Sequence, residues 1–250
     1  MIDRVAVDGR PAQAADLGLA VAARYGHFTA MQVRRGRVRG LDLHLDRLEG
    51  ANAELFGVPL DRELALASVR AALGGEPDAS VRVIVVDRGG IRVIATATPP
   101  AEVATEPRAV VSAAYQRFLP HIKHLGGFPQ AYLGERARAA GYDEALLVGP
   151  DGRISEGAIT NLGCFDGERV VWPDAPMLHG ITMRLIERAG PPCVRRPLTA
   201  ADLPGHRAVF LANSIGVVPV GRVDDLALKV DEEIMARLIA MYEETPWDPI

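Results

Sequence analysis

The sequence predicts an α+β fold, a mixed α/β arrangement of antiparallel strands with helices beside them, in two domains. Strand patterns separated by tight-turn residues alternate with helical patterns, but without the regular strand-helix-strand repeat of a doubly wound parallel sheet. The 250 residues are enough for two modest domains. We expect an N-terminal domain over residues 1–112, a linker over 113–120 and a C-terminal domain over 121–250.

The first domain is expected to combine hairpins with two helices. A strand over residues 28–33 leads through a turn at Arg35 to a short returning strand. A helix follows from about Leu43, and the segment LALASVRAAL repeats apolar residues at the spacing of a second helix. VRVIVVD and IRVIATA then predict two buried strands, because both are dense in valine and isoleucine.

The second domain is expected to begin after the proline-rich connection TPPAEVATEP, which leads into a strand over 109–112. A helix is predicted over 130–140, ended by Gly141. EALLV, RISEG, ITNLGCF and RVVW predict successive antiparallel strands joined by hairpins. One helix opens at GIT, the last strands lie in AVFLANSIGVVPVGRVD, and a final helix covers 231–242.

Composition excludes several classes of function. A net charge of -4 and a pI near 5.9 argue against a binder of nucleic acid or of anionic membranes, since both need a concentrated basic surface. No apolar stretch approaches the roughly 18 residues of a spanning helix, and no signal peptide is evident, so we expect a cytoplasmic protein. No metal site is predicted, because His121 and His124 have no acid or cysteine at ligand spacing.

One lysine and one glutamate occur where covalent and acid–base chemistry is feasible. Lys123 stands in FLPHIKHLGGF, where a proline and two glycines bracket a short apolar segment. Most lysines are solvated surface residues, but a lysine desolvated at a strand end is nucleophilic. Glu156 follows the turn in PDGRIS, as either an exposed strand residue or a buried carboxylate that meets a cation. Asn161 then either steadies that carboxylate or its strand, or serves a turn.

Other polar groups suit a phosphate. GITMRL opens a helix with backbone amides, including that of Ile181, and with the hydroxyl of Thr182, although ordinary capping explains the same pattern. Arg47 offers a bidentate phosphate partner or else a surface ion pair. Asn213 and Ser214 supply loop contacts or form a plain turn. Together, an amine, an acid and phosphate-binding groups are what pyridoxal 5'-phosphate requires.

With these residues, the sequence resembles the class IV aminotransferases, the fold type IV group of pyridoxal phosphate enzymes. This group includes branched-chain and D-amino-acid aminotransferases and aminodeoxychorismate lyase. The resemblance rests on five pieces in the family's order: GHFTAMQVRRGRVRGLDLHLDRL, IKHLGGF, AGYDEALLVGPDGRISEGAITNL, LHGITMRL and ANSIGVVPV. These pieces span most of the chain, and their order is more specific than any single motif.

The resemblance implies a two-domain fold with the cofactor in the interdomain cleft, and a homodimer whose partner subunit helps complete each site. It makes Lys123 the catalytic Schiff-base lysine and Glu156 the partner of the pyridine nitrogen. The phosphate ligands that it implies are Arg47, Ile181, Thr182, and Asn213 or Ser214.

Three departures from the branched-chain pattern bear on specificity. Phe128 stands where those enzymes carry a tyrosine, ANSI replaces an SGT-like loop, and Met183 separates GIT from Arg184. The first two bring the chain closer to the lyase. In turn, Ala30 and Gln32 depart from the lyase's opening motif.

Three functions follow as hypotheses. The first is transfer of an amino group between an amino acid, or a related amine, and a 2-oxo acid. The second is a lyase reaction that eliminates pyruvate from aminodeoxychorismate. The third is a non-catalytic homologue that keeps the fold for binding, against which the retention of Lys123 and Glu156 argues. For either enzyme, Phe28, Arg24 and Arg117 are the candidate substrate contacts.

Overall fold

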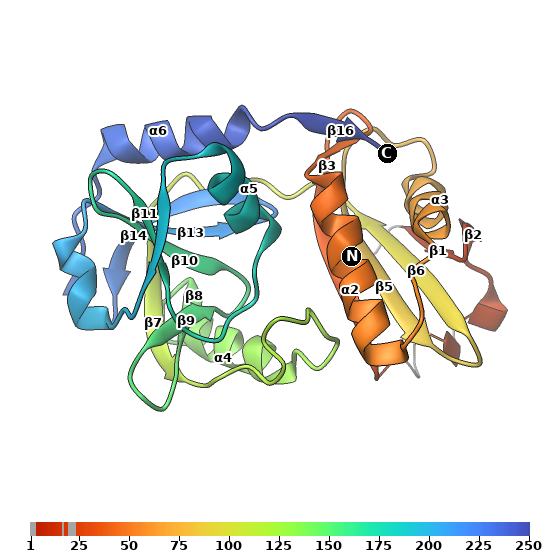
Figure 1. Cartoon of the computed structure of the whole chain (residues 1–250), viewed down its shortest axis with the longest axis horizontal. Coiled ribbons are helices and arrows are strands. Elements are labelled where there is room, and N and C mark those ends of the chain that lie inside the picture. The colour runs from red at the N-terminus through yellow and green to blue at the C-terminus, as the bar shows by residue number, and fades with distance from the viewer. Residues whose placement is uncertain (1–3, 17, 20–23) are drawn as a thin grey trace. The chain divides into compact units, whose positions relative to one another are not determined.

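The computed structural model describes residues 4–16, 18–19 and 24–250, which form two compact units (Figure 1). Unit 1 contains Met1–Glu102, Ile122–Gly126 and Pro246–Ile250, and unit 2 contains Val103–His121 and Gly127–Thr245. This division differs from the expected linker at 113–120 in two ways: residues 103–112 belong to unit 2, and two short segments later in the chain pack with unit 1. The mixture of helices and sheets confirms the predicted α+β class.

In the described part of unit 1, five strands form an antiparallel sheet in the order β2-β1-β6-β5-β3. The strands are β1 (Arg4–Val7), β2 (Arg10–Pro11), β3 (Gly26–Val33), β5 (Ala79–Asp87) and β6 (Ile91–Thr98). A short 3-10 helix, η1 (Ala14–Asp16), follows β2. Helices α2 (Leu41–Phe56) and α3 (Arg62–Leu73) share one apolar core with the sheet.

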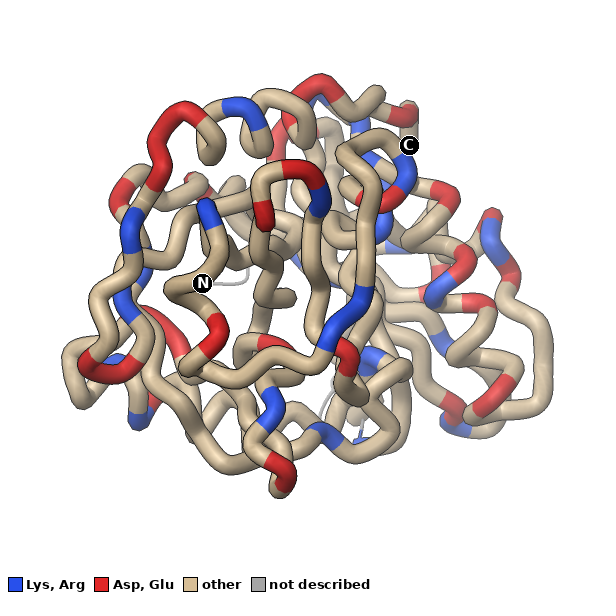
Figure 2. Tube along the Cα trace, turned by 60° about the vertical axis from the view of Figure 1, so that its left-hand side comes forward, with Lys and Arg blue, Asp and Glu red and all other residues tan. Residues whose placement is uncertain are grey.

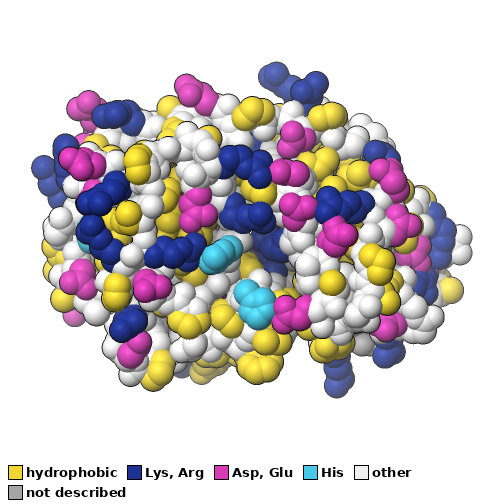
Figure 3. All heavy atoms as spheres, in the orientation of Figure 1, with side chains coloured by type: hydrophobic (Ala, Val, Ile, Leu, Met, Phe, Trp, Pro, Cys, Tyr) yellow, Lys and Arg dark blue, Asp and Glu magenta, His cyan; other side chains and the backbone are white. Residues whose placement is uncertain are grey.

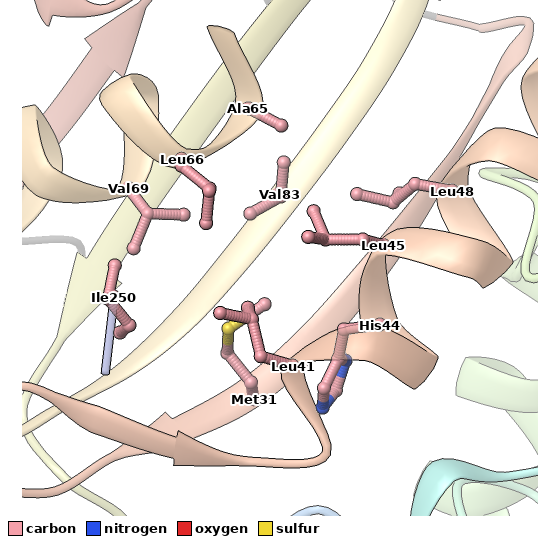
Figure 4. A pocket seen from close by; sticks show the side chains of 10 residues that line it. All are labelled: Met31, Leu41, His44, Leu45, Leu48, Ala65, Leu66, Val69, Val83 and Ile250. Atoms are coloured by element: carbon pink, nitrogen blue, oxygen red, sulfur yellow. The ribbon is translucent and has the colours of Figure 1, made fainter. Parts of the chain in front are cut away.

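That core forms because each element presents one apolar face. Leu48 on α2, Val69 on α3 and Val83 on β5 are buried and point toward one another (Figure 4). Ile250, from the far end of the chain, reaches the same cluster. It directly follows β16 (Trp247–Pro249), which pairs with β4 (Arg37–Arg39) in a two-stranded sheet. The C-terminal segment is therefore an integral part of unit 1.

Unit 2 lies wholly within the described range 24–250, and its nine strands form one mixed sheet. The path runs β12-β11-β10-β13-β14-β7-β8-β9, with β15 on β14. The strands are β7 (Arg108–Ala114), β8 (Glu144–Val148), β9 (Ile154–Gly157), β10 (Asn161–Phe165), β11 (Val170–Pro173), β12 (Cys193–Arg196), β13 (Ala208–Asn213), β14 (Gly216–Val223) and β15 (Leu226–Ala227). The helices are α4 (Phe128–Ala139), α5 (Ile181–Ala189), the 3-10 helix η2 (Ala200–Gly205) and α6 (Glu232–Glu243).

The predicted run of antiparallel hairpins is only partly right. The β8–β9 and β10–β11 pairs are antiparallel as expected. However, β9 ends the sheet, whereas β10 lies within it and pairs with β13. The pairs β7–β8, β14–β7 and β11–β12 are parallel. Long-range pairing of buried strands thus overrides the local hairpin signal between β9 and β10.

Charged residues of both signs are spread along the chain (Figure 2). On the face that Figure 3 shows, basic and acidic groups are interspersed. No helix within the described residues combines the length and the apolar character that crossing a membrane demands.

Candidate active site

Lys123 lies on the outer edge of the unit 1 sheet. Its carbonyl accepts a hydrogen bond from the backbone N–H of Phe28 at 2.8 Å, and the N–H of Leu125 donates to the carbonyl of Gly26 at 2.9 Å. The segment Ile122–Gly126 therefore continues the sheet beside β3. Gly26 permits close packing on both sides, because a Cβ there would lie 3.0 Å from Cδ1 of Leu125 and 2.5 Å from the carbonyl oxygen of Val85 on β5.

The Lys123 amine lies against an aromatic ring. Its Nζ is 4.9 Å from the ring centroid of Phe28, and the guanidinium carbon of Arg82 is 4.6 Å from the same centroid. The electron-rich face of the ring stabilises nearby cations. The two basic groups are thus within about 10 Å of each other. The sequence singled out Phe28 and Lys123 but missed Arg82, because only the pairing of β3 with β5 brings it there.

Arg47 is held by a buried hydrogen-bonded chain on the helical side of β3. Its Nη2 donates to the Thr29 hydroxyl, whose oxygen is 2.6 Å from Nδ1 of His44. Thr29 and His44 are both buried. His44 and Arg47 lie three residues apart on α2, so both reach the same strand residue. This spacing is visible in the sequence, in HLDR, although the sequence does not show that Thr29 joins the two residues.

Glu156 is a buried carboxylate with a buried arginine beside it in unit 2. It is 4% exposed and Arg117 is 8% exposed, and 3.9 Å separates Nη1 of Arg117 from Oε1 of Glu156. Burial lowers the pKa of the Arg117 guanidinium, and the charge of Glu156 opposes that shift. The other carboxylate oxygen, Oε2, accepts a hydrogen bond from the N–H of Leu178 at 3.2 Å. The alternative of an exposed strand glutamate is therefore wrong.

Asn161 supports the same backbone from the other side. Its side-chain Nδ2 donates to the carbonyl of Leu178 at 2.7 Å. Its Oδ1 packs so closely on Gly180 that a Cβ there would fall well inside van der Waals distance. Glu156 and Asn161 thus hold both backbone hydrogen-bonding groups of Leu178, just before α5 begins.

Helix α5 starts without a side-chain cap. Gly180 is its N-cap residue, in an extended conformation, and makes no side-chain capping bond. The Thr182 hydroxyl donates to the backbone carbonyl of Asn213 at 2.6 Å, which joins the helix start to the turn that follows β13. The Asn213 side chain accepts from the N–H of Ile215 at 2.8 Å and so shapes the turn that contains Ser214.

The predicted residues therefore fall into two groups. In unit 1, Phe28 and Lys123 lie against each other, whereas Arg47 binds Thr29 on the helical side of β3. Unit 2 brings together Arg117, Glu156, Asn161, Ile181, Thr182, Asn213 and Ser214 through the contacts around Leu178 and α5. Arg24 is exposed in unit 1 and stands apart from these contacts. Phe128, 78% exposed, opens α4 and stacks on Tyr132 with 6.2 Å between ring centroids.

Comparison with known proteins identifies the family. Residues 26–223 match the family described as Amino-transferase class IV, so the chain belongs to the class IV aminotransferases. No curated protein matches the chain.

Solved structures share the fold at low sequence identity. A fold IV-transaminase from Curtobacterium pusillum has a TM-score of 0.79 at 22% identity, and the match covers 97% of this chain and 99% of that one. A putative 4-amino-4-deoxychorismate lyase from Legionella pneumophila gives 0.79 at 20% identity, covering 94% and 96%. The branched-chain aminotransferase of the archaeon Thermoproteus uzoniensis, solved with norvaline, gives 0.81 at 20% identity, covering 97% and 94%.

Proposed function

We propose that the protein is a pyridoxal 5'-phosphate-dependent aminotransferase that moves an amino group between an amino acid, or a related amine, and a 2-oxo acid. The observation that carries the proposal is the arrangement around Leu178. There, a buried carboxylate and the uncapped start of α5 are fixed by the same backbone. A carboxylate suits a protonated ring nitrogen, and a helix start suits a phosphate.

The residues present fit this cofactor. The chain offers a lysine amine, the buried Glu156, the uncapped amides at the start of α5 and the Arg47 guanidinium. Position 180 before α5 requires glycine, because the Asn161 side chain occupies the place that a Cβ would take. When bound, the cofactor supplies a conjugated ring that accepts the electron pair released at the substrate α-carbon.

Each residue has a defined task in this proposal. Nζ of Lys123 would be the amine that binds the cofactor aldehyde. When a substrate amine takes its place, the freed Nζ would act as the base that moves the α-proton of the substrate. Glu156 keeps a proton on the ring nitrogen through its charge. The phosphate-binding groups are Arg47, the amides of Ile181 and Thr182 and the turn at Asn213 and Ser214, which the Thr182 hydroxyl holds through the Asn213 carbonyl.

The use of basic residues supports the assignment of Lys123. Of the 28 lysines and arginines in the sequence, Lys123 and Lys229 are the two lysines. Arginine replaces lysine well in surface ion pairs, but its guanidinium does not form a Schiff base. Lys123 is therefore one of two side chains in the sequence whose amine can form a Schiff base.

The two lysines also give a matched experiment. The wild-type protein, Lys123→Ala and Lys229→Ala are loaded with pyridoxal 5'-phosphate, and their visible absorbance spectra are recorded. Lys229 is exposed and has no assigned role. We expect a band in the wild type and in Lys229→Ala that is missing from Lys123→Ala, and borohydride reduction should fix the mass of the cofactor on the peptide containing residue 123. A band retained by Lys123→Ala would refute the assignment.

A panel of amino acids of both configurations then tests the reaction. Conversion of the cofactor to its amine form by a donor, and its return by a 2-oxo acid, is the expected result. The ANSI loop and Phe128 favour the lyase as the second candidate. Pyruvate released from aminodeoxychorismate without an acceptor would establish that reaction instead. The homodimer also remains a prediction, which sedimentation of the purified protein tests.

A further inference from the structure

Glu144 is a buried carboxylate that the proposed function does not use. It is 7% exposed at the start of β8, and its Oε1 accepts hydrogen bonds from the N–H of Ile159 at 2.7 Å and from the hydroxyl of Thr160 at 3.0 Å. The backbone N–H of Thr160 donates to it as well. A buried acceptor with three donors from one short turn specifies the shape of that turn.

Gly157 closes the other side of this turn. Its N–H donates to the carbonyl of Thr160 at 2.9 Å, and the N–H of Ala158 donates to the carbonyl of Ala145 at 2.9 Å. A Cβ on Gly157 would lie 2.5 Å from Oε1 of Glu144 and would also collide with the Thr160 hydroxyl. The Glu144 carboxylate therefore packs directly on the glycine Cα, in a space that a side chain at 157 would occupy.

The turn joins two residues that meet again on Leu178. Glu156 directly precedes Gly157 and Asn161 directly follows Thr160. Glu156 accepts from the Leu178 N–H, and Asn161 donates to the Leu178 carbonyl. The separation and orientation of these two side chains depend on the four-residue turn between them. That turn is fixed by Glu144.

We propose that Glu144 is a positioning residue that sets the 157–160 turn, so that Glu156 and Asn161 together hold Leu178 and the start of α5 in place. This inference rests on the proposed function for its catalytic consequence. Its structural part stands on the contacts alone. Burial raises the pKa of Glu144, its three hydrogen-bond donors oppose that shift, and Arg108 adds a smaller opposing charge.

Hydrogen exchange of the cofactor-free protein tests the structural part. Glu144→Met keeps the length of the side chain but removes the acceptor, whereas Glu144→Gln keeps one acceptor. The matched control is Asp143→Asn. Asp143 is the adjacent carboxylate, and it binds Arg108 and the N–H of Ala109 without reaching the turn. We expect Glu144→Met to speed amide exchange about tenfold or more in peptides covering both 157–161 and 176–183. Glu144→Gln should fall between Glu144→Met and the wild type, and Asp143→Asn should leave both peptides unchanged.

Three results would overturn the inference. The first is an amide exchange rate in Glu144→Met equal to that of the wild type. The second is faster exchange in Glu144→Met that is confined to 157–161. The third is the same acceleration in Asp143→Asn. If Glu144→Met does not fold, Thr160→Ala removes one donor to the same carboxylate, and Thr160→Ser, which keeps the hydroxyl, is its control. Faster exchange in 176–183 for the alanine and not for the serine supports the inference, and equal exchange in the two overturns it.

A double-substitution cycle tests the catalytic part. A misplacement of about 1 Å at a reacting group lowers rates by up to about a hundredfold. Glu144→Met should therefore lower kcat about tenfold or more when Glu156 is present, but less than about twofold in a Glu156→Gln background. Equal effects in both backgrounds would show that Glu144 does not act through Glu156. A wild-type protein without a Lys123-dependent band would refute the proposed function, while the exchange experiment would still decide the structural part.

Discussion

Replacing Gly180 by alanine is expected to disturb the start of α5 through a single contact. The backbone at Gly180 has φ -62° and ψ 149°, a conformation that alanine adopts without strain. The obstacle is Oδ1 of Asn161, which occupies the position that the new Cβ needs. A loss of stability in Gly180→Ala therefore reports on the packing of Asn161 and not on strain in the folded backbone.

The size of the effect follows from the displacement required. Restoring an ordinary contact of about 3.4 Å requires a movement of about 1 Å, and overpacking of this kind costs about 1–3 kcal/mol. Moving Asn161 also weakens its 2.7 Å bond to the Leu178 carbonyl, which contributes about 1 kcal/mol. Removing a glycine from the unfolded chain returns about 0.4–1 kcal/mol. We therefore expect Gly180→Ala to lower the free energy of unfolding by about 1–3 kcal/mol.

Urea unfolding of the cofactor-free protein measures this loss, and titration with pyridoxal 5'-phosphate measures its effect on affinity. In an Asn161→Ala background the obstacle is gone, so Gly180→Ala should then cost almost nothing. Gly205→Ala is the control, because nothing lies within 4 Å of the Cβ it would add. If Gly180→Ala costs as much with Asn161→Ala as without it, the contact does not account for the glycine.

Three further predictions concern unit 1. Asp248→Ala should lower stability to urea by about 1 kcal/mol, because its carboxylate accepts from the N–H of Leu41 at 2.9 Å at the otherwise uncapped start of α2; no loss would contradict this capping role. Gly50→Ala should raise stability by about 0.5–1 kcal/mol, since Gly50 lies inside α2 with open space around it; a decrease in Tm would contradict this. Burial lowers the pKa of His27 from 6.5 to about 4, so the unfolded chain binds the proton first as pH falls. About 2 kcal/mol of stability should be lost between pH 7 and pH 5, and His27→Phe should flatten this part of the profile unless another group causes the loss.

The sequence predicted those elements whose signal is local. β5 and β6 follow from dense valine and isoleucine, and α3 follows from apolar residues at helical spacing. The strands β1 and β16 were missed, because each is short and gains its stability from a distant partner. Trp247 pairs with Arg39, 208 residues earlier in the chain, and the Arg39 guanidinium lies 4.1 Å from the centroid of its ring. Such a pairing leaves no periodic pattern around either residue.

The candidate site shows the same limit. Lys123 in unit 1 and Glu156 in unit 2 stand in recognisable motifs, and their catalytic roles stay predictions. Their supports were not readable in advance. Lys123 is fixed by backbone pairing with β3, and the residue that links Glu156 to α5 is Leu178, through its N–H and carbonyl. Backbone groups are the same in every residue apart from proline, so the sequence carries no mark of such a role.

Glu156 and Asn161 both bind the backbone of Leu178, so a substitution at either residue affects more than one function. Glu156 would act on the ring nitrogen through its charge, yet its Oε2 also accepts the hydrogen bond that steadies the approach to α5. Removing its charge and removing its hydrogen bond are therefore different perturbations. The first would weaken only acid–base chemistry, whereas the second would also loosen the amides that we assign to the phosphate. Substitutions of residues that share one partner do not have additive effects. The contributions of positions 144, 156 and 161 can therefore be separated only by measuring the double substitutions as well as the single ones.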